Sequence, residues 1–300
     1  MVLAATAVFA ASCGKESIKS KGQTYTTGDD VIKIESVTAG YTKVETSLKL
    51  IGAPEGCTTD DLESLIFYIS RKDDKIGEGS QWDWKFTYTI TKGKTDFPGT
   101  ITRIYYQDTT FYYAAVATFK GFNRALKTVG KTTVTTKKLP TFTGTGSDKA
   151  HPYIDLGKVA DGGAGVWAWY DLGTDTPFKA NEVSCTYDKA ISYPKDSWGT
   201  GWRVPNKDEV SGLSDNCSSK VITVKEKKYY CLTSRFNNET IFVNTCENVS
   251  GSYFFKYEDV SSPTKYGFFT PRDGNLMDWG SYSIPSGNIK AKIRPVRVSN

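Results

Sequence analysis

The chain has 300 residues, of which 38% are hydrophobic and 24% are charged, and this composition excludes a disordered protein and predicts a globular one. The length suits two domains of ordinary size. The formal net charge of +5 is too small to indicate nucleic-acid binding, and no motif for such binding occurs. Aromatic residues make up 13% of the chain, which favours β-structure because aromatic side chains fit a pleated, half-buried surface.

Residues 1–13 have the pattern of a secretory signal peptide. An apolar run, residues 2–11, is followed by Ser12 and Cys13, and this run is too short to span a membrane. The segment resembles a lipoprotein signal of the Bacteroidetes type, in which a peptidase cuts before the cysteine and the thiol is acylated. The resemblance implies export and a lipid anchor on Cys13 in the outer membrane. The alternative is an N-terminal core strand with a chance cysteine.

The sequence leaves three features of this N-terminal end open. No Lys or Arg precedes the apolar run, so the true start of the protein is not settled. The leaflet that holds the anchor is not settled either, nor is exposure at the cell surface. Residues 14–30 are polar and rich in Gly, Ser, Thr and Lys, and they predict a flexible tether.

With Cys13 occupied by lipid, an odd number of cysteines remains. In an oxidising compartment an odd number implies at least one free thiol. Up to two disulfides are expected in the C-terminal half, and the pairing is not readable from the spacings. The spacings do not indicate a zinc site. The remaining cysteines are Cys57, Cys185, Cys217, Cys231 and Cys246.

Residues 31–139 predict an all-β domain. Apolar side chains alternate with polar ones at residues 44–50, 65–69, 81–90 and 109–119, with Gly, Asp and Pro between the runs. Short alternating strands with such turns are typical of a β-sandwich. The strand TTFYY and the closing strand KTTVTTKK resemble those of immunoglobulin-like or fibronectin-III-like modules of Bacteroidetes lipoproteins.

Several tryptophans alternate along predicted strands. Trp82 and Trp84 stand at period two in the strand predicted over residues 81–90, so they share one face. They could form an exposed ligand platform, but same-face aromatics in a strand usually belong to the core, and we expect that here. For the same reason we expect Trp167 and Trp169 in the core of the second domain.

Residues 140–150 have the sequence PTFTGTGSDKA, which predicts a linker, and the second domain is expected over residues 151–300. Six motifs follow in order: HPYIDLG (151–157), VWAWYDLG (166–173), WGTGWRVPNKDEVSGL (198–213), NC (216–217), NNETIFV (237–243) and IRPVR (293–297). This series resembles the Fibrobacter succinogenes major paralogous domain (FISUMP). The resemblance implies an α+β fold of the C-type-lectin-like superfamily, to which sulfatase-modifying enzymes also belong.

The third motif also has a physical interpretation of its own. Asn206 is a candidate N-cap, and Glu209 three residues later completes the spacing of a capping box. The apolar residues Val210, Leu213 and Cys217 then fall on one face of the predicted helix. We therefore interpret the motif as structural, with a catalytic role of Glu209 as the alternative.

The sequence lacks the motifs of the enzyme classes considered. His151 is the one histidine, and nothing in the sequence places it beside a nucleophile. The enzyme branch of the superfamily uses two closely spaced cysteines near the end of the domain, and no cysteine follows Cys246. The triplets of calcium-dependent lectins are absent, although calcium binding by clustered oxygens stays open. We therefore expect a protein that is not an enzyme and has no cofactor and no metal site.

In the C-type-lectin-like fold the ligand usually meets a long loop before the last strand. Here we expect that loop over residues 268–288, where rigid aromatics stand beside Arg and Asn, a mixture typical of protein and glycan contacts. The alternative is that Trp279 fills the domain core beneath an ordinary loop. The candidate ligand-binding residues are Arg272, Asp273, Asn275, Trp279 and Tyr282.

The sequence as a whole predicts a mainly β, two-domain cell-envelope lipoprotein. Its partners would be a membrane, through the lipid, and an extracellular glycan or protein, for ligand binding or adhesion. A second hypothesis is a structural or accessory subunit of a fimbrial or polysaccharide-uptake assembly. A third is an enzyme of the sulfatase-modifying type. The identity of the ligand and the oligomeric state are not readable from the sequence.

Overall fold

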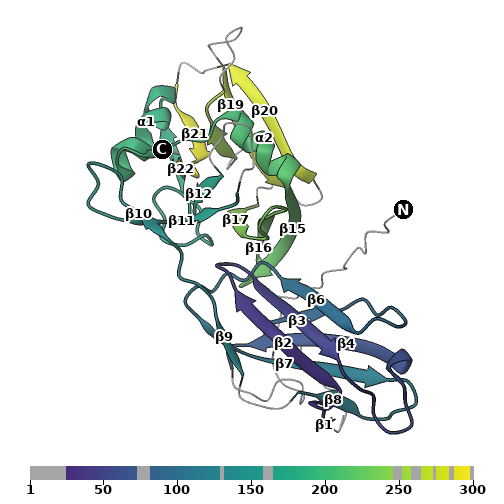
Figure 1. The fold of residues 1–300 in the computed structure, drawn as a ribbon. Helices are drawn as coiled ribbons and strands as arrows, with labels where there is room; N and C mark the ends of the chain where they lie inside the picture. The colour runs from purple at the N-terminus through teal and green to yellow at the C-terminus, as the bar shows by residue number, and fades with distance from the viewer. Residues whose placement is uncertain are drawn as a thin grey trace. The chain divides into compact units, whose positions relative to one another are not determined.

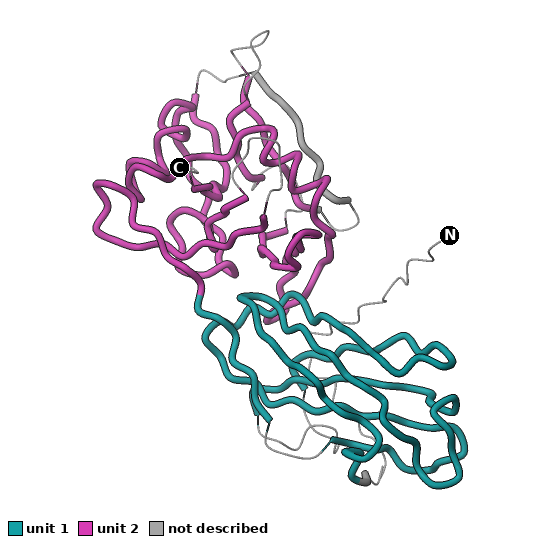
Figure 2. Tube along the Cα trace, viewed as in Figure 1, with its two compact units in different colours: residues 1–138 teal, residues 139–300 magenta. Residues whose placement is uncertain are grey.

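The computed structural model describes residues 25–72, 82–128, 132–157, 165–245, 252–257, 265–272, 275–283 and 287–297. Over these residues the protein is mainly β, with 22 strands, two α-helices and one short 3-10 helix (Figure 1). The contacts between Cα atoms divide the chain into two compact units, which Figure 2 colours separately. Unit 1 comprises residues 1–138 and unit 2 comprises residues 139–300.

Unit 1 is built from two β-sheets. Its elements are β1 (Tyr25–Thr27), β2 (Ile32–Ala39), β3 (Val44–Leu50), the 3-10 helix η1 (Thr59–Asp61), β4 (Leu62–Ser70), β5 (Trp84–Thr87), β6 (Asp96–Ile101), β7 (Thr110–Phe119), β8 (Ala125–Lys127) and β9 (Thr133–Thr135). The larger sheet has the order β1-β8-β7-β4-β5, with β9 paired to β7, and the smaller has the order β2-β3-β6.

The two sheets of unit 1 share one hydrophobic core. In β3 the side chains of Val44, Thr46, Leu48 and Leu50 are buried while most of their neighbours are half-buried or exposed, as the alternating sequence predicts. Residues of β4, β7 and β6 pack against them within the same cluster. The burial of one face of each strand therefore holds the sheets together.

The tryptophans of the strand predicted over residues 81–90 have different environments. Only the four residues of β5 are strand, and Trp84 within it is 3% exposed and makes edge contacts with Tyr105, Tyr106 and Phe111. Trp82 lies before the strand and is half-buried beside Tyr68. The core interpretation is confirmed for Trp84, and the two rings do not form a common platform.

The segment predicted as a tether over residues 14–30 does not remain outside the fold along its whole length. Residues Tyr25–Thr27 form β1 and pair in parallel with β8. The backbone N–H of Gly28 also donates to the carbonyl of Lys127 over 2.8 Å. The first sheet thus begins before residue 31, because the edge strand β8 offers its unpaired backbone groups to this segment. Residues 1–24, with Cys13, lie outside the described part of the chain.

Unit 2 contains three β-sheets and both α-helices. Its elements are β10 (Thr141–Phe142), β11 (His151–Asp155), β12 (Val166–Ala168), β13 (Glu182–Cys185), α1 (Tyr187–Trp198), β14 (Trp202–Arg203), α2 (Lys207–Asn216), β15 (Cys217–Val224), β16 (Lys227–Ser234), β17 (Thr240–Asn244), β18 (Tyr253–Phe255), β19 (Lys265–Arg272), β20 (Asn275–Ser283), β21 (Ile289–Lys292) and β22 (Val296–Arg297). The sheets have the orders β10-β11-β12-β22-β14, β13-β21-β18-β19-β20 and β15-β16-β17.

Residues 140–150, predicted as a linker, are instead part of unit 2. Strand β10 pairs antiparallel with β11, and Thr145 forms a bridge with Thr200. Gly144 allows this approach, since a Cβ atom there would lie 2.4 Å from the carbonyl oxygen of Trp198. Gly144, one of the two glycines of the predicted linker, therefore serves close backbone contact within unit 2.

Candidate functional site

Two of the motifs of unit 2 meet in a buried ion pair. Asp171 lies in the second motif and Arg294 in the last, and both side chains are fully buried. Nε of Arg294 donates to Oδ1 of Asp171 over 2.7 Å. The rest of the guanidinium donates to the carbonyl oxygens of Trp169 (2.7 Å), Phe242 (3.0 Å) and Ala168 (3.2 Å). The guanidinium thus donates four hydrogen bonds to oxygen acceptors.

The second carboxylate oxygen of Asp171 is also occupied. It accepts from the hydroxyl of Tyr253 over 3.0 Å and from the side-chain amide of Asn244 over 3.2 Å. Burial raises the pKa of Tyr253, so its hydroxyl stays protonated and acts as a donor. Both oxygens of this buried carboxylate are therefore occupied by donors of the fold, as a charge removed from water requires.

A second ion pair fixes the start of helix α2. Glu209 is fully buried, and its two oxygens accept from the guanidinium of Arg203 over 2.7 Å each. Its Oε2 also accepts from the backbone N–H of Asn206, while Oδ1 of Asn206 accepts from the backbone N–H of Glu209, both over 2.9 Å. The predicted capping box is therefore confirmed, and Val210 and Leu213 lie on a buried face of the helix as predicted. Cys217 is also buried, but its prediction as a helix residue is wrong, because the helix ends at Asn216 and Cys217 begins β15 in an extended conformation.

His151 lies in a cluster of aromatic rings. It stacks on Trp198 with ring centroids 3.9 Å apart, and it meets Tyr170 and Trp202 edge-on. Only 8% of the residue is exposed. Burial, and secondly the charge of Lys149, lower the pKa of His151. The imidazole thus packs as an aromatic ring, and Trp167 and Trp169 are buried as predicted.

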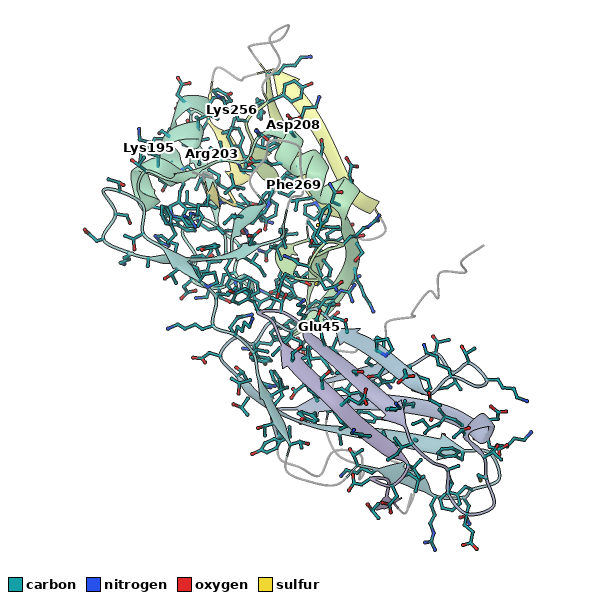
Figure 3. The ribbon with its side chains drawn as sticks, in the orientation of Figure 1. Glu45, Lys195, Arg203, Asp208, Lys256 and Phe269 are labelled. Carbon is teal, nitrogen blue, oxygen red and sulfur yellow. The ribbon has the colours of Figure 1, made fainter. Side chains whose placement is uncertain are left out.

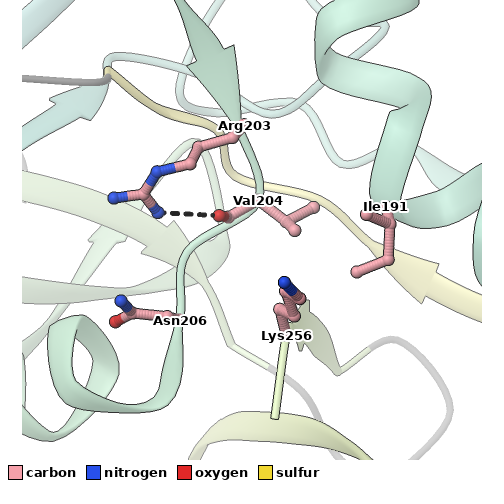
Figure 4. A pocket seen from close by; sticks show the side chains of 5 residues that line it. All are labelled: Ile191, Arg203, Val204, Asn206 and Lys256. Atoms are coloured by element: carbon pink, nitrogen blue, oxygen red, sulfur yellow. Dashed lines mark hydrogen bonds between the residues drawn. The ribbon is translucent and has the colours of Figure 1, made fainter. Parts of the chain in front are cut away.

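One cavity lies beside this framework, with a volume of about 290 Å³. Its lining combines Ile191 of α1, Arg203 of β14, Val204 and Asn206 of the connection to α2, and Lys256 after β18 (Figure 4). Asn206 and Lys256 form a parallel bridge, and this bridge holds the two segments together. Arg203 and Lys256 are also labelled among the side chains of Figure 3. Three separate segments therefore create the cavity.

The sequence-predicted ligand residues lie elsewhere, in a β-hairpin. Arg272 ends β19 and pairs with Asn275, the first residue of β20, while Trp279 and Tyr282 lie along β20. The prediction of a long loop over residues 268–288 is therefore wrong for most of that range, which the strands β19 and β20 occupy. The dipeptide Asp273-Gly274 between the two strands is the sequence signal that favours a two-residue hairpin here.

The hairpin and the cavity use different residues. The described residues that line the cavity include none of the five predicted ligand residues, of which Asp273 and the side chains of the other four lie outside the described part of the structure. Arg203 and Asn206 belong to a motif that the sequence singled out, but as structural residues. No sequence pattern marked Lys256 as a cavity residue. It lies beside Asn206 because it directly follows β18 and forms a parallel bridge with Asn206.

The described cysteines are thiols. Cys57, Cys185, Cys217 and Cys231 form no disulfide, so the expected pairs in the C-terminal half are absent among the described residues. Burial raises the pKa of the Cys217 thiol to about 12, which removes its nucleophilic form at neutral pH. Cys246 lies outside the described residues.

Among the described residues, no helix has both the length and the apolar composition that a membrane crossing requires. No group of three or more His, Cys, Asp and Glu side chains is placed there to hold a metal ion.

Comparisons with known proteins add little to this description. No family model and no curated protein matches the chain. A solved structure, that of a DUF4784 family protein from Bacteroides caccae ATCC 43185, aligns with 86% of this chain at 9% identity and a TM-score of 0.23. This chain covers 52% of that protein, about half of its length. A likeness at this score carries no argument about fold or function.

Replacing Arg294 with Met should destabilise unit 2 strongly. The change leaves the carboxylate of Asp171 buried without its partner, and loss of one member of a buried pair costs about 3–5 kcal/mol. Denaturant unfolding followed by tryptophan fluorescence measures the effect. Arg297→Met is the matched control in the same motif, because Arg297 is only half-buried and stacks on Phe142 and Tyr153. Equal midpoints for both variants would contradict the assigned role of the ion pair.

Unit 2 should lose stability as the pH falls through 6.5. The pKa of His151 is lowered from 6.5 in the folded protein, so the unfolded chain binds this proton at higher pH than the folded one. The contribution of neutral His151 to the free energy of unfolding is fully present above pH 6.5. It declines as the pH falls from 6.5 to the lowered pKa of His151 in the folded protein. His151→Phe keeps an aromatic ring but cannot be protonated. Its unfolding midpoint, measured from about pH 5 to about pH 8, should lack this decline.

Proposed function

We propose that the chain is a non-catalytic cell-envelope lipoprotein that binds a ligand outside the cell through unit 2. One contrast carries the proposal. Two acidic residues of the motifs, Asp171 and Glu209, have both oxygens bound in the fold, and His151 is packed among rings. A cavity with half-buried polar side chains nevertheless remains at the surface of the same unit. Such a surface suits binding better than acid–base chemistry.

Unit 1 and unit 2 have separate roles in this proposal. Unit 1 would be an immunoglobulin-like or fibronectin-III-like sandwich that spaces unit 2 from the membrane, and its two sheets with one core support this assignment. Unit 2 would be a FISUMP domain of C-type-lectin-like fold. The six motifs in order, and the contact of two of them through Asp171 and Arg294, support that assignment.

A second candidate is a structural or accessory subunit of a fimbrial or polysaccharide-uptake assembly. Strand β20 favours it, because in the described sheet this strand is an edge and pairs with β19 alone. An edge strand offers a row of backbone donors and acceptors to a strand of another chain. In that case the partner would be a protein of the same envelope, and no soluble ligand would bind.

A binding screen tests the first candidate. The purified mature chain, with Cys13 replaced by Ser so that it carries no lipid, is applied to a glycan array and to extracellular-matrix proteins, with calcium and with a chelator. We expect a saturable hit that does not need calcium. If the hairpin is the contact face, Trp279→Ala should weaken the hit at least about thirtyfold, the loss typical of an aromatic hot spot.

The control for this variant is Phe236→Ala. Phe236 is an aromatic residue of unit 2 that is 60% exposed, and it lies outside the hairpin. Circular dichroism checks that both variants are folded. No hit in either panel contradicts ligand binding and favours the assembly subunit, which a pull-down from the native envelope would then identify.

The lipid anchor has a separate test. Cys13→Ala should move the protein from the membrane fraction to the soluble fraction, because acylation of this thiol is the proposed attachment. Incorporation of labelled fatty acid should be lost as well. Cys57→Ala serves as the control, since Cys57 lies in the folded part of unit 1. Unchanged membrane fractionation of Cys13→Ala would refute the anchor.

A further inference from the structure

Strand β1 and the last two strands of unit 1 run in the same direction. Strand β1 pairs in parallel with β8, from Tyr25↔Ala125 to Thr27↔Lys127 (Figure 1). Strands β8 and β9 each pair antiparallel with β7, so β9 continues the direction of β8 along a further stretch of β7. The chain therefore passes into the described part of unit 1 at the start of β1, and it continues toward unit 2 beyond the end of β9.

This arrangement decides how tension between the two ends of unit 1 acts on β1. Tension pulls β1 back toward its start and pulls β8 and β9 forward toward their ends. Strands β1 and β8 are thus drawn past each other along the strand axis. Since the hydrogen bonds of a sheet run between the strands, the bonds that join β1 to β8 carry this force together. An antiparallel pair with the same entry and exit would instead open one bond after another, from one end.

Gly28 holds β1 in place at the end of this strand. Its backbone N–H donates to the carbonyl of Lys127 over 2.8 Å, and its own carbonyl accepts from the N–H groups of Val31 (3.0 Å) and Ile32 (2.7 Å). A Cβ atom at Gly28 would lie 3.1 Å from the backbone nitrogen of Lys127, so the missing side chain allows this approach. Val31 and Ile32 belong to the hydrophobic core, and only a tight turn therefore separates β1 from the core.

The chain is also bonded into unit 1 where it leaves β9. Thr136 is 1% exposed, and its backbone N–H donates to the carbonyl of Thr109 over 3.0 Å. Its hydroxyl donates to the carbonyl of Tyr106 over 2.7 Å and accepts from the backbone N–H of Thr109 over 3.1 Å. The backbone N–H of Lys137 donates to the carbonyl of Gly40 over 2.9 Å. Tension that arrives from the side of unit 2 therefore meets a strand that is fixed in the sheet.

We propose that unit 1 is a spacer that resists tension, with the parallel pair of β1 and β8 as its clamp. The inference rests on the proposed function, in which the N-terminal end is held at a membrane and unit 2 binds outside the cell. A pull on the bound ligand then passes through β1. While β1 stays paired with β8, the force does not reach β2 and the core. When β1 leaves, residues 25–31 extend by at most about 25 Å and the force passes to β2.

Two directions of pulling test the clamp in the unlipidated full chain. Optical tweezers hold a peptide tag at the N-terminus and, as the second point, an azide-bearing residue in place of Lys138 or of Arg124. Both side chains are exposed, Lys138 lies beyond the end of β9, and Arg124 lies just before β8. From position 124 the pull opens β1 and β8 at their neighbouring starts. At equal loading rate, the first opening from position 138 should need at least about twice the force, because the bonds must break together.

Two proline variants identify the bonds that carry the force. The N–H groups of a strand point alternately to its two sides, so the N–H of Thr26 faces β8 as that of Gly28 does, and the N–H of Thr27 faces away. Thr26→Pro removes a donor of the pair and should lower the opening force from position 138 to about that from position 124. Thr27→Pro is the matched control and should retain most of the resistance. Thermal unfolding checks that both variants are folded.

The outcomes separate this inference from the proposed function. Equal opening forces in the two directions, or an equal loss of resistance in the two proline variants, would overturn the clamp. Neither measurement needs lipid or ligand, so such a result leaves the binding proposal standing. Silence of the glycan and matrix panels, together with an opening force that depends on direction, refutes ligand binding and leaves the clamp standing.

Discussion

The ion pair between Asp171 and Arg294 is the constraint on which the architecture of unit 2 depends. The two residues are 123 positions apart, so the pair forms only when the beginning and end of the unit have come together. Removing a charge from water costs several kcal/mol, roughly, unless the charge is paired and hydrogen-bonded. Arg294 meets this condition with carbonyls near β12 and in β17, and Asp171 meets it with Tyr253 and Asn244. One buried pair therefore links the first, second and third sheets of this unit.

The pair of Arg203 with Glu209 has a local effect of the same kind. It holds the connection between β14 and α2 against the helix start, and Val204 and Asn206 of this connection become walls of the cavity. A ligand that enters finds its polar partners already placed, so little ordering entropy opposes binding. The charged residues Arg203 and Glu209 of this motif thus fix the wall of the cavity.

Local alternation of apolar and polar residues is enough to set the buried face of a strand. The alternating residues of β3 and β4 became strands with one buried face, because period two alone sets which side chains meet the core. Of the strand predicted over residues 81–90, only β5 is a strand in the structure. The segment 140–150, predicted as a linker, contains β10, which pairs with β11. In both cases the backbone partner decided the outcome, and a partner distant in the chain leaves no local pattern.

The sequence by itself determined the mainly β composition, the burial of the motif tryptophans and the capping box of α2. These features depend on neighbours within one strand or one helical turn, so the spacing of residues along the sequence is enough to predict them. Only the tertiary structure decided that Asp171 meets Arg294, that residues 265–283 fold back as a hairpin, and that Lys256 lies beside Asn206 at a cavity. Those contacts join segments that the sequence separates, and which segments become neighbours is decided by sheet order and by the packing of a shared core.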